Sequence, residues 1–110
     1  MPGVFEVKDA SAGQFMFTLE TDDGEIIFTS ENYTTKASAN TGIASVKANA
    51  PKDAQYERKV SSNKQHYFVL KGGNGEKLGR SEMYTSAVGM EKGIASVKAN
   101  APSAPVRGST

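Results

Sequence analysis

The ten residues GIASVKANAP occur twice in this 110-residue chain, from Gly42 to Pro51 and again from Gly93 to Pro102. The two halves align without a gap at an offset of 51 residues over almost their whole length. A repeat of this kind indicates that one structural unit is written twice. A unit of about 50 residues buries little surface alone, and the chain has no cysteine to supply disulfides. We therefore expect the copies, residues 3–51 and 54–102, to share one core.

Each copy predicts three strands. Apolar and polar residues alternate through three short segments of each copy, which is typical of half-buried strands. Turn sequences rich in Gly, Asn and Asp separate the second segment from the third. The expected strands are 4–7, 14–19 and 25–29 in the first copy and 54–58, 66–70 and 76–80 in the second.

A helix is expected after the third strand of each copy. Thr34 or Thr35 in the first copy, and Thr85 or Ser86 in the second, can accept a hydrogen bond as N-cap. The apolar residues of each decapeptide then fall on one helical face, and its proline closes the segment. The decapeptide is therefore predicted to be the packing half of an amphipathic helix.

Two pairs of repeated residues within this helix need a separate explanation. Gly42 and Gly93 disfavour a helix by roughly 1 kcal/mol relative to alanine. Their recurrence predicts either a close approach to another backbone or a break into two short helices. Packing does not explain why the outward-facing Ser45 and Ser96 are identical as well, and recent duplication is the simplest reason.

The repeated motifs resemble those of the YegP-like family of uncharacterised bacterial proteins. The most specific are Gly-Glu, Ser-Glu-x-Tyr and Gly-Ile-Ala-Ser-Val-Lys-x-Asn-Ala-Pro, each occurring twice, and the resemblance covers residues 3–102. It implies an α+β fold in which two tandem β-β-β-α repeats form a single six-stranded antiparallel sheet with helices packed on one face. Members carry one or two copies, so this chain is expected to be a monomer with internal pseudo-two-fold symmetry. Whether the helices are exchanged between the repeats stays open, and the family brings no established activity.

Charge is divided unequally between the halves. Residues 1–51 hold three basic and seven acidic residues, whereas residues 52–110 hold ten basic and five acidic ones. Either the two halves attract each other, or the basic half meets an acidic partner.

Sequence motifs for catalysis are missing. The only histidine, His66, aligns with Phe15 of the first copy, and GGNGE at 72–76 lacks the Lys-Ser/Thr of a phosphate-binding loop. We therefore predict a non-enzymatic protein with no catalytic residues, no metal ligands and no cofactor.

A binding module is the predicted function class, with an unknown protein or a small ligand as partner. Nucleic acid is the alternative, because basic and aromatic residues are interleaved on the strands of the second copy. Its basic strand residues are Arg58, Lys59, Lys64, Lys71, Lys77 and Arg80. The candidate binding residues that we select are Lys47, Lys98, Tyr33, Tyr84, Arg58, Lys59 and Lys71.

The sequence also predicts where the protein is located and whether its C-terminal tail is ordered. Residues 1–7 do not resemble a signal peptide, and no segment approaches the roughly 20 apolar residues that span a bilayer. We expect a cytoplasmic protein without membrane contact. The tail SAPVRGST, residues 103–110, is predicted to be disordered.

Overall fold

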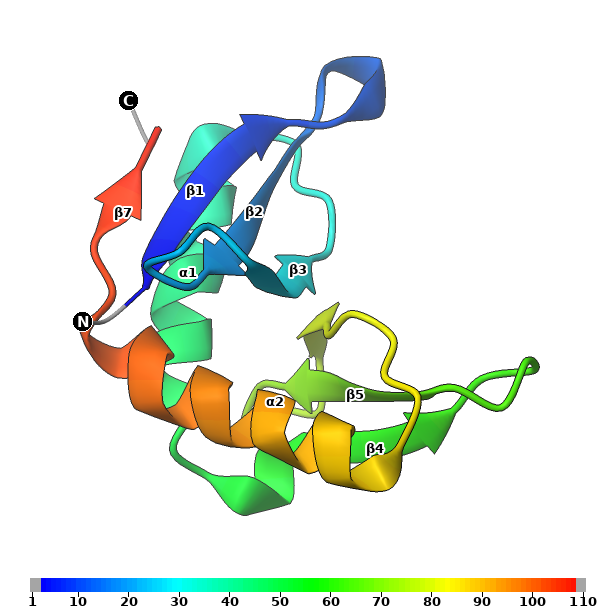
Figure 1. Ribbon diagram of the computed structural model, residues 1–110. Coiled ribbons are helices and arrows are strands. Elements are labelled where there is room, and N and C mark those ends of the chain that lie inside the picture. The colour runs from blue at the N-terminus through cyan, green and yellow to red at the C-terminus, as the bar shows by residue number, and fades with distance from the viewer. Residues whose placement is uncertain (1–2, 109–110) are drawn as a thin grey trace.

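In the described part of the chain, seven strands form one mixed sheet, in the order β4-β5-β6-β3-β2-β1-β7, and two helices complete the fold of this computed structural model (Figure 1). The structure describes residues 3–108. The strands are β1 Val4–Asp9, β2 Phe15–Glu20, β3 Ile26–Ser30, β4 Tyr56–Val60, β5 His66–Lys71, β6 Lys77–Arg80 and β7 Val106–Arg107. The helices are α1 Lys36–Asn49 and α2 Ala87–Asn100, and short 3-10 turns span Ser11–Gly13, Asp53–Gln55 and Ala101–Ser103.

The first six strands follow the predicted pattern of two antiparallel meanders, each followed by a helix. Within each copy the second strand pairs with the first and the third. The copies meet where β3 pairs with β6 in antiparallel register, with Thr29 opposite Arg80 and Ser30 opposite Gly79. Figure 1 shows this junction between the two halves of the molecule. The repeat is thus built into one continuous sheet.

The seventh strand contradicts two predictions, a six-stranded antiparallel sheet and a disordered tail at 103–110. Residues Val106–Arg107 run parallel to β1, which makes the sheet mixed, and only residues 109–110 of the tail lie outside the described residues. Ala104 is fully buried, and the Phe5 amide donates to the Pro105 carbonyl at 2.9 Å. The edge of β1 has unpaired backbone groups, and the tail satisfies them. A short polar segment gives no sequence pattern for this pairing.

One hydrophobic core joins both copies. Phe5, Leu19 and Phe28 stand opposite one another across β1, β2 and β3, and all three are fully buried. Both helices lie on this face of the sheet and contribute to the same buried cluster. Their buried apolar residues are Ala39, Ile43 and Val46 in α1 and Met90, Ile94 and Val97 in α2.

Each helix spans the junction between the copies. Helix α1 contacts β1 and β2 of its own copy and also β5 and β6, whereas α2 contacts β5 and also β3. The Tyr56 hydroxyl donates to the Ala50 carbonyl at the end of α1 at 2.7 Å, a buried bond between the copies. The helices are therefore shared between the repeats rather than kept within them.

Both helices begin as predicted and run without a break. The Thr35 hydroxyl accepts from the Ser38 amide at 3.0 Å, and the Ser86 hydroxyl accepts from the Gly89 amide at the same distance. These two residues are the N-caps. Within residues 3–108, no helix is both long and apolar enough to span a membrane.

Gly42 and Gly93 each contact a tyrosine ring. An ideal Cβ on Gly42 would lie 2.6 Å from Cζ of Tyr33, and one on Gly93 would lie 2.7 Å from Cζ of Tyr84. The predicted close approach is present in both helices, but it is an approach to a side chain and not to another backbone.

Candidate functional site

The two lysines of the repeated decapeptide lie over aromatic rings of the core. Lys47 Nζ lies 5.8 Å from the ring centre of Phe5, and Lys98 Nζ lies 5.6 Å from that of Tyr56. Cation–π contacts of this kind contribute about 0.5–1 kcal/mol at exposed sites. The contact recurs because Phe5 and Tyr56 are themselves equivalent in the repeat. Both candidate lysines therefore have a structural role at the edges of the helices.

Two candidate cations, Arg58 and Lys98, share one carboxylate. Arg58 Nη2 lies 3.0 Å from Asp53 Oδ1, and Lys98 Nζ lies 2.8 Å from the same oxygen. Arg58 Nε also lies 2.6 Å from Glu91 Oε2 on α2. Hydrogen bonds from Lys98 and Arg58 lower the pKa of Asp53, and a hydrogen bond from Arg58 lowers that of Glu91. The network joins β4 to α2 and neutralises both candidates.

The other two basic candidates, Lys59 and Lys71, meet at Glu57. Their Nζ atoms lie 3.7 Å and 3.2 Å from Glu57 Oε1. A hydrogen bond from Lys71 is the main reason why the pKa of Glu57 is lowered. The predicted basic face of the second copy is therefore interrupted by its own carboxylates.

Tyr33 and Tyr84 extend the sheet beyond β3 and β6. Tyr33 exchanges two backbone hydrogen bonds with Phe15, at 2.6 and 2.7 Å, and Tyr84 exchanges two with His66, both at 2.7 Å. The Tyr33 ring also stacks on Phe17, with ring centres 6.1 Å apart. Burial raises the pKa of both phenols, and nearby glutamates raise it further. Each ring thus packs against the core, and each tyrosine is half-buried as a whole.

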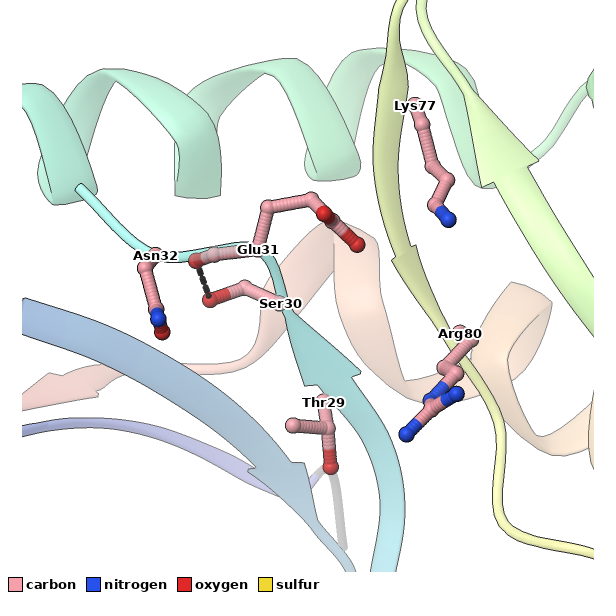
Figure 2. Close-up of a pocket in the computed structure, with 6 residues that line it drawn as sticks. All are labelled: Thr29, Ser30, Glu31, Asn32, Lys77 and Arg80. Carbon is pink, nitrogen blue, oxygen red and sulfur yellow. Dashed lines mark hydrogen bonds between the residues drawn. The ribbon is translucent and has the colours of Figure 1, made fainter. Parts of the chain in front are cut away.

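A polar hollow of about 320 Å³ lies at the junction of the copies, which we call the seam pocket (Figure 2). Its lining residues are Thr29, Ser30, Glu31, Asn32, Lys77 and Arg80. One wall comes from the end of β3 and the following loop, and the other from β6. Thr29 neighbours Phe28 along β3, so its side chain lies on the face opposite the core. Arg80 stands directly opposite Thr29 and shares that face.

The polar groups of the seam pocket are only partly used by the fold. The Ser30 hydroxyl accepts from the Phe17 amide and donates to the Glu31 carbonyl, both at 2.8 Å. The proton of this hydroxyl is therefore already used in a hydrogen bond within the fold. Lys77 and Arg80, in contrast, form no ion pair within residues 3–108. The pocket therefore offers two cations from one strand.

The seam pocket uses residues of both copies, but it has no equivalent lining under the repeat. Under the repeat, Lys77 corresponds to Ile26 and Asn32 corresponds to Met83, so the equivalent position lacks one cation and the amide. Sequence reasoning named Lys77 and Arg80 as basic strand residues but did not select them. Their separation from Glu31 and Asn32 along the chain gives no sign of the shared hollow. No group of three His, Cys, Asp or Glu side chains in the described part of the chain is arranged to hold a metal ion.

The chain matches the model of a domain of unknown function, DUF1508, twice, over residues 10–57 and 61–107. The chain belongs to the DUF1508 family. The YegP-like resemblance found in the sequence is confirmed by its relatives. The UPF0339 protein YegP of Escherichia coli (strain K12) is 49% identical over 110 residues, covering 100% of both chains. A UPF0339 protein of Bordetella pertussis is 52% identical over 110 residues, covering 100% of this chain and 98% of the relative.

Two solved structures of family members have the same fold. The solution NMR structure of the protein of unknown function yegP from E. coli has a TM-score of 0.92 at 49% identity, covering 98% of this chain and 93% of that one. The solution NMR structure of a UPF0339 protein from Shewanella oneidensis has a TM-score of 0.91 at 40% identity, with coverage of 98% and 92%. These relatives establish an α+β fold, and none of their names assigns a function.

Proposed function

We propose that this DUF1508 protein is a monomeric, non-enzymatic binding module that takes a small anionic ligand in the seam pocket. The observation that carries the proposal is the pair Lys77 and Arg80, two cations on one wall of a hollow with no carboxylate of residues 3–108 paired to them. Arginine and lysine are the side chains that bind carboxylate and phosphate groups most strongly. The volume of about 320 Å³ lies at the lower end of the range for ligand pockets.

The opposite wall refines the chemistry of the proposed ligand. Glu31 is an acceptor, and the Thr29 hydroxyl and the Asn32 amide both donate and accept hydrogen bonds. A ligand with a hydrogen-bond donor beside its anionic group would satisfy both walls. The proposed class is therefore a small phosphate or carboxylate compound that also bears an amino or hydroxyl group.

Other surfaces have less support. Lys47 and Lys98 at the helix edges lie over aromatic rings, and Arg58, Lys59 and Lys71 are held by carboxylates. Electrostatic contact with a nucleic-acid backbone would require these pairs to be broken or shared. The seam pocket needs no such rearrangement.

An NMR titration of ¹⁵N-labelled protein with O-phosphoserine and with inorganic phosphate tests the proposal. We expect saturable shifts of the amides of residues 29–32 and 77–80. Changing Lys77→Gln and Arg80→Gln together should weaken binding about tenfold or more, because charge-assisted hydrogen bonds are lost. Lys52→Gln removes one positive charge outside the pocket and serves as the control for non-specific charge attraction.

Two outcomes would overturn the proposal. One is the absence of saturable shifts at the seam, and the other is an equal loss of binding in Lys52→Gln. A short single-stranded oligonucleotide forms a separate arm of the titration. Shifts at Arg58, Lys59 and Lys71 that disappear by about 0.3 M salt would favour the nucleic-acid alternative instead, because phosphate contacts depend steeply on salt.

A further inference from the structure

Two more hollows, one beside each helix, correspond to each other under the repeat. The α1 pocket, about 320 Å³, is lined by Tyr33, Ser38, Thr41, Gly42, Ser45 and Glu76. The α2 pocket, about 270 Å³, is lined by Glu25, Ile27, Tyr84, Gly89, Lys92, Gly93 and Ser96. At the offset of 51, every residue of the α1 pocket has its counterpart in the α2 pocket. Tyrosine, glycine, serine and glutamate are kept, whereas Thr41 becomes Lys92 and Ser38 becomes Gly89.

Each pocket is completed by the other copy. Tyr33 and Ser45 belong to the first copy, but Glu76 comes from the turn before β6 in the second. Likewise Glu25 from the first copy meets Tyr84 and Ser96 of the second. The glutamates act on the phenols, since Glu76 contributes to the raised pKa of Tyr33 and Glu25 to that of Tyr84. The pockets therefore exist only where two repeats share a sheet.

Packing does not explain why some of the residues that the two pockets have in common are the same. Ser45 lies half-buried on the outward side of α1, and neither its hydroxyl nor the Tyr33 hydroxyl has a hydrogen-bond partner in residues 3–108. The side chain of Glu76 likewise forms no ion pair there. The pocket thus gathers a carboxylate and two hydroxyl oxygens whose hydrogen-bonding capacity the fold does not use.

We propose that the α1 pocket binds an amino or guanidino group, and that Lys92 supplies the equivalent group to the α2 pocket from within the chain. The α1 lining has one carboxylate, several hydroxyl oxygens and no cation, which suits a positively charged hydrogen-bond donor. An anion would be repelled by Glu76.

The α2 pocket differs from the α1 pocket in having a cation among its own lining residues. Lys92 is a lining residue together with Glu25 and Tyr84, so the net charge of this lining is neutral, although the exposed Lys92 ammonium group forms no ion pair within residues 3–108. The α1 lining keeps one negative charge. The two pockets therefore differ in charge while most of their remaining groups are the same, and only the α1 pocket has the charge to recruit an external cation.

The test uses Gly42 and Gly93 as reporters, because each amide lies in the lining of its own pocket. Labelled full-length protein is titrated with n-butylammonium and methylguanidinium, and separately with the peptides Gly-Lys-Gly and Gly-Arg-Gly. We expect saturable shifts at Gly42 and not at Gly93. Tighter binding of the peptides would identify a partner's side chain as the source of the group, and tighter binding of the free amines would identify a small molecule.

Four variants separate this proposal from non-specific attraction. Glu76→Gln should weaken binding at Gly42 about tenfold, whereas its matched control Glu25→Gln should leave it unchanged. Thr41→Lys should abolish binding at Gly42, and Lys92→Thr should create binding at Gly93. These positions are exposed, so the spectra should retain the native pattern. Equal shifts at Gly42 and Gly93 in the unmodified protein, or binding that survives Glu76→Gln unchanged, would overturn the proposal.

Discussion

The phenol ring of Tyr33 lies across the backbone of Gly42, at the place where any other residue would carry its Cβ. Tyr84 and Gly93 repeat the relationship in the second copy. Ser-Glu-x-Tyr and Gly-Ile-Ala-Ser are separate motifs in the sequence, and the fold makes them two sides of one contact. The glycine is needed because the tyrosine occupies its side-chain volume.

Replacing Gly42 or Gly93 by alanine should destabilise the protein. Alanine favours a helix by roughly 1 kcal/mol, but overpacking against the tyrosine ring typically costs about 1–3 kcal/mol. We expect a lower urea midpoint for Gly42→Ala and for Gly93→Ala. Gly89→Ala is the matched control, because its Cβ would meet no atom closer than 3.4 Å. A midpoint for Gly42→Ala as high as that of Gly89→Ala would contradict the steric explanation.

Truncating the tyrosines should be more costly. Tyr33→Ala and Tyr84→Ala each remove a ring packed against the core, and we expect a loss of about 3 kcal/mol or more in the free energy of unfolding. Tyr33→Phe keeps the ring and should remain close to the unmodified protein. In a Gly42→Ala background the cost of Tyr33→Ala should fall, because the two residues compete for one volume. Strictly additive costs in this cycle would rule out the contact.

Removing the Tyr56 hydroxyl should weaken the connection between the copies. Tyr56→Phe leaves the buried Ala50 carbonyl without its side-chain donor, which costs about 1–3 kcal/mol. Phe5 is the equivalent residue in the first copy, so a phenylalanine ring is expected to fit the position of Tyr56. Tyr67→Phe, at a half-buried tyrosine on the next strand, is the control and should have little effect on thermal unfolding.

Ser30 and Ser81 should be equally sensitive to substitution. Ser30 accepts from the buried Phe17 amide, and Ser81 accepts from the Phe68 amide at 3.0 Å. Alanine would leave each amide unpaired, at a cost of about 1–3 kcal/mol. Chemical denaturation of Ser30→Ala and Ser81→Ala, with the exposed Ser11→Ala as control, measures this cost. If the serine variants match Ser11→Ala, the hydrogen bonds contribute nothing to stability.

The contact between the C-terminal tail and Glu6 should make the free energy of unfolding depend on pH in the acidic range. A hydrogen bond from Arg107 is the main reason why the pKa of Glu6 lies below its ordinary value. The unfolded-state pKa of a glutamate is about 4.3, and the folded-state pKa of Glu6 lies lower. The ionised Glu6 carboxylate therefore stabilises the fold fully at pH values above about 4.3. This stabilisation is lost as the pH falls through the folded-state pKa. Arg107→Gln should raise the pKa of Glu6 in an NMR titration of side-chain carboxyls. The pKa of Glu57, which Lys71 lowers, should stay unchanged and is the internal control.

Much of the candidate chemistry could not be predicted from the sequence. The recurrence of Lys47 and Lys98 at helix edges predicts binding, but it also follows from the aromatic ring that lies beneath each lysine, Phe5 and Tyr56 respectively. Lys77 and Arg80 were visible as basic residues, yet their position beside Glu31 depends on the pairing of β3 with β6. No spacing along the chain encodes that pairing, because it joins residues about fifty positions apart.

The sequence by itself determined the repeat, six of the strands and both helices, and it limited each N-cap to two neighbouring residues. These features follow from short-range physics: side-chain periodicity, turn chemistry and hydrogen bonds within a few residues. Only the tertiary structure decided the seventh strand, the sharing of the helices between copies and the three pockets. Each of these depends on which distant backbones lie side by side: Val106 pairs with Phe5 because β1 has no other strand on that side. Local sequence fixes what each segment can form, whereas strand register and packing fix which side chains meet.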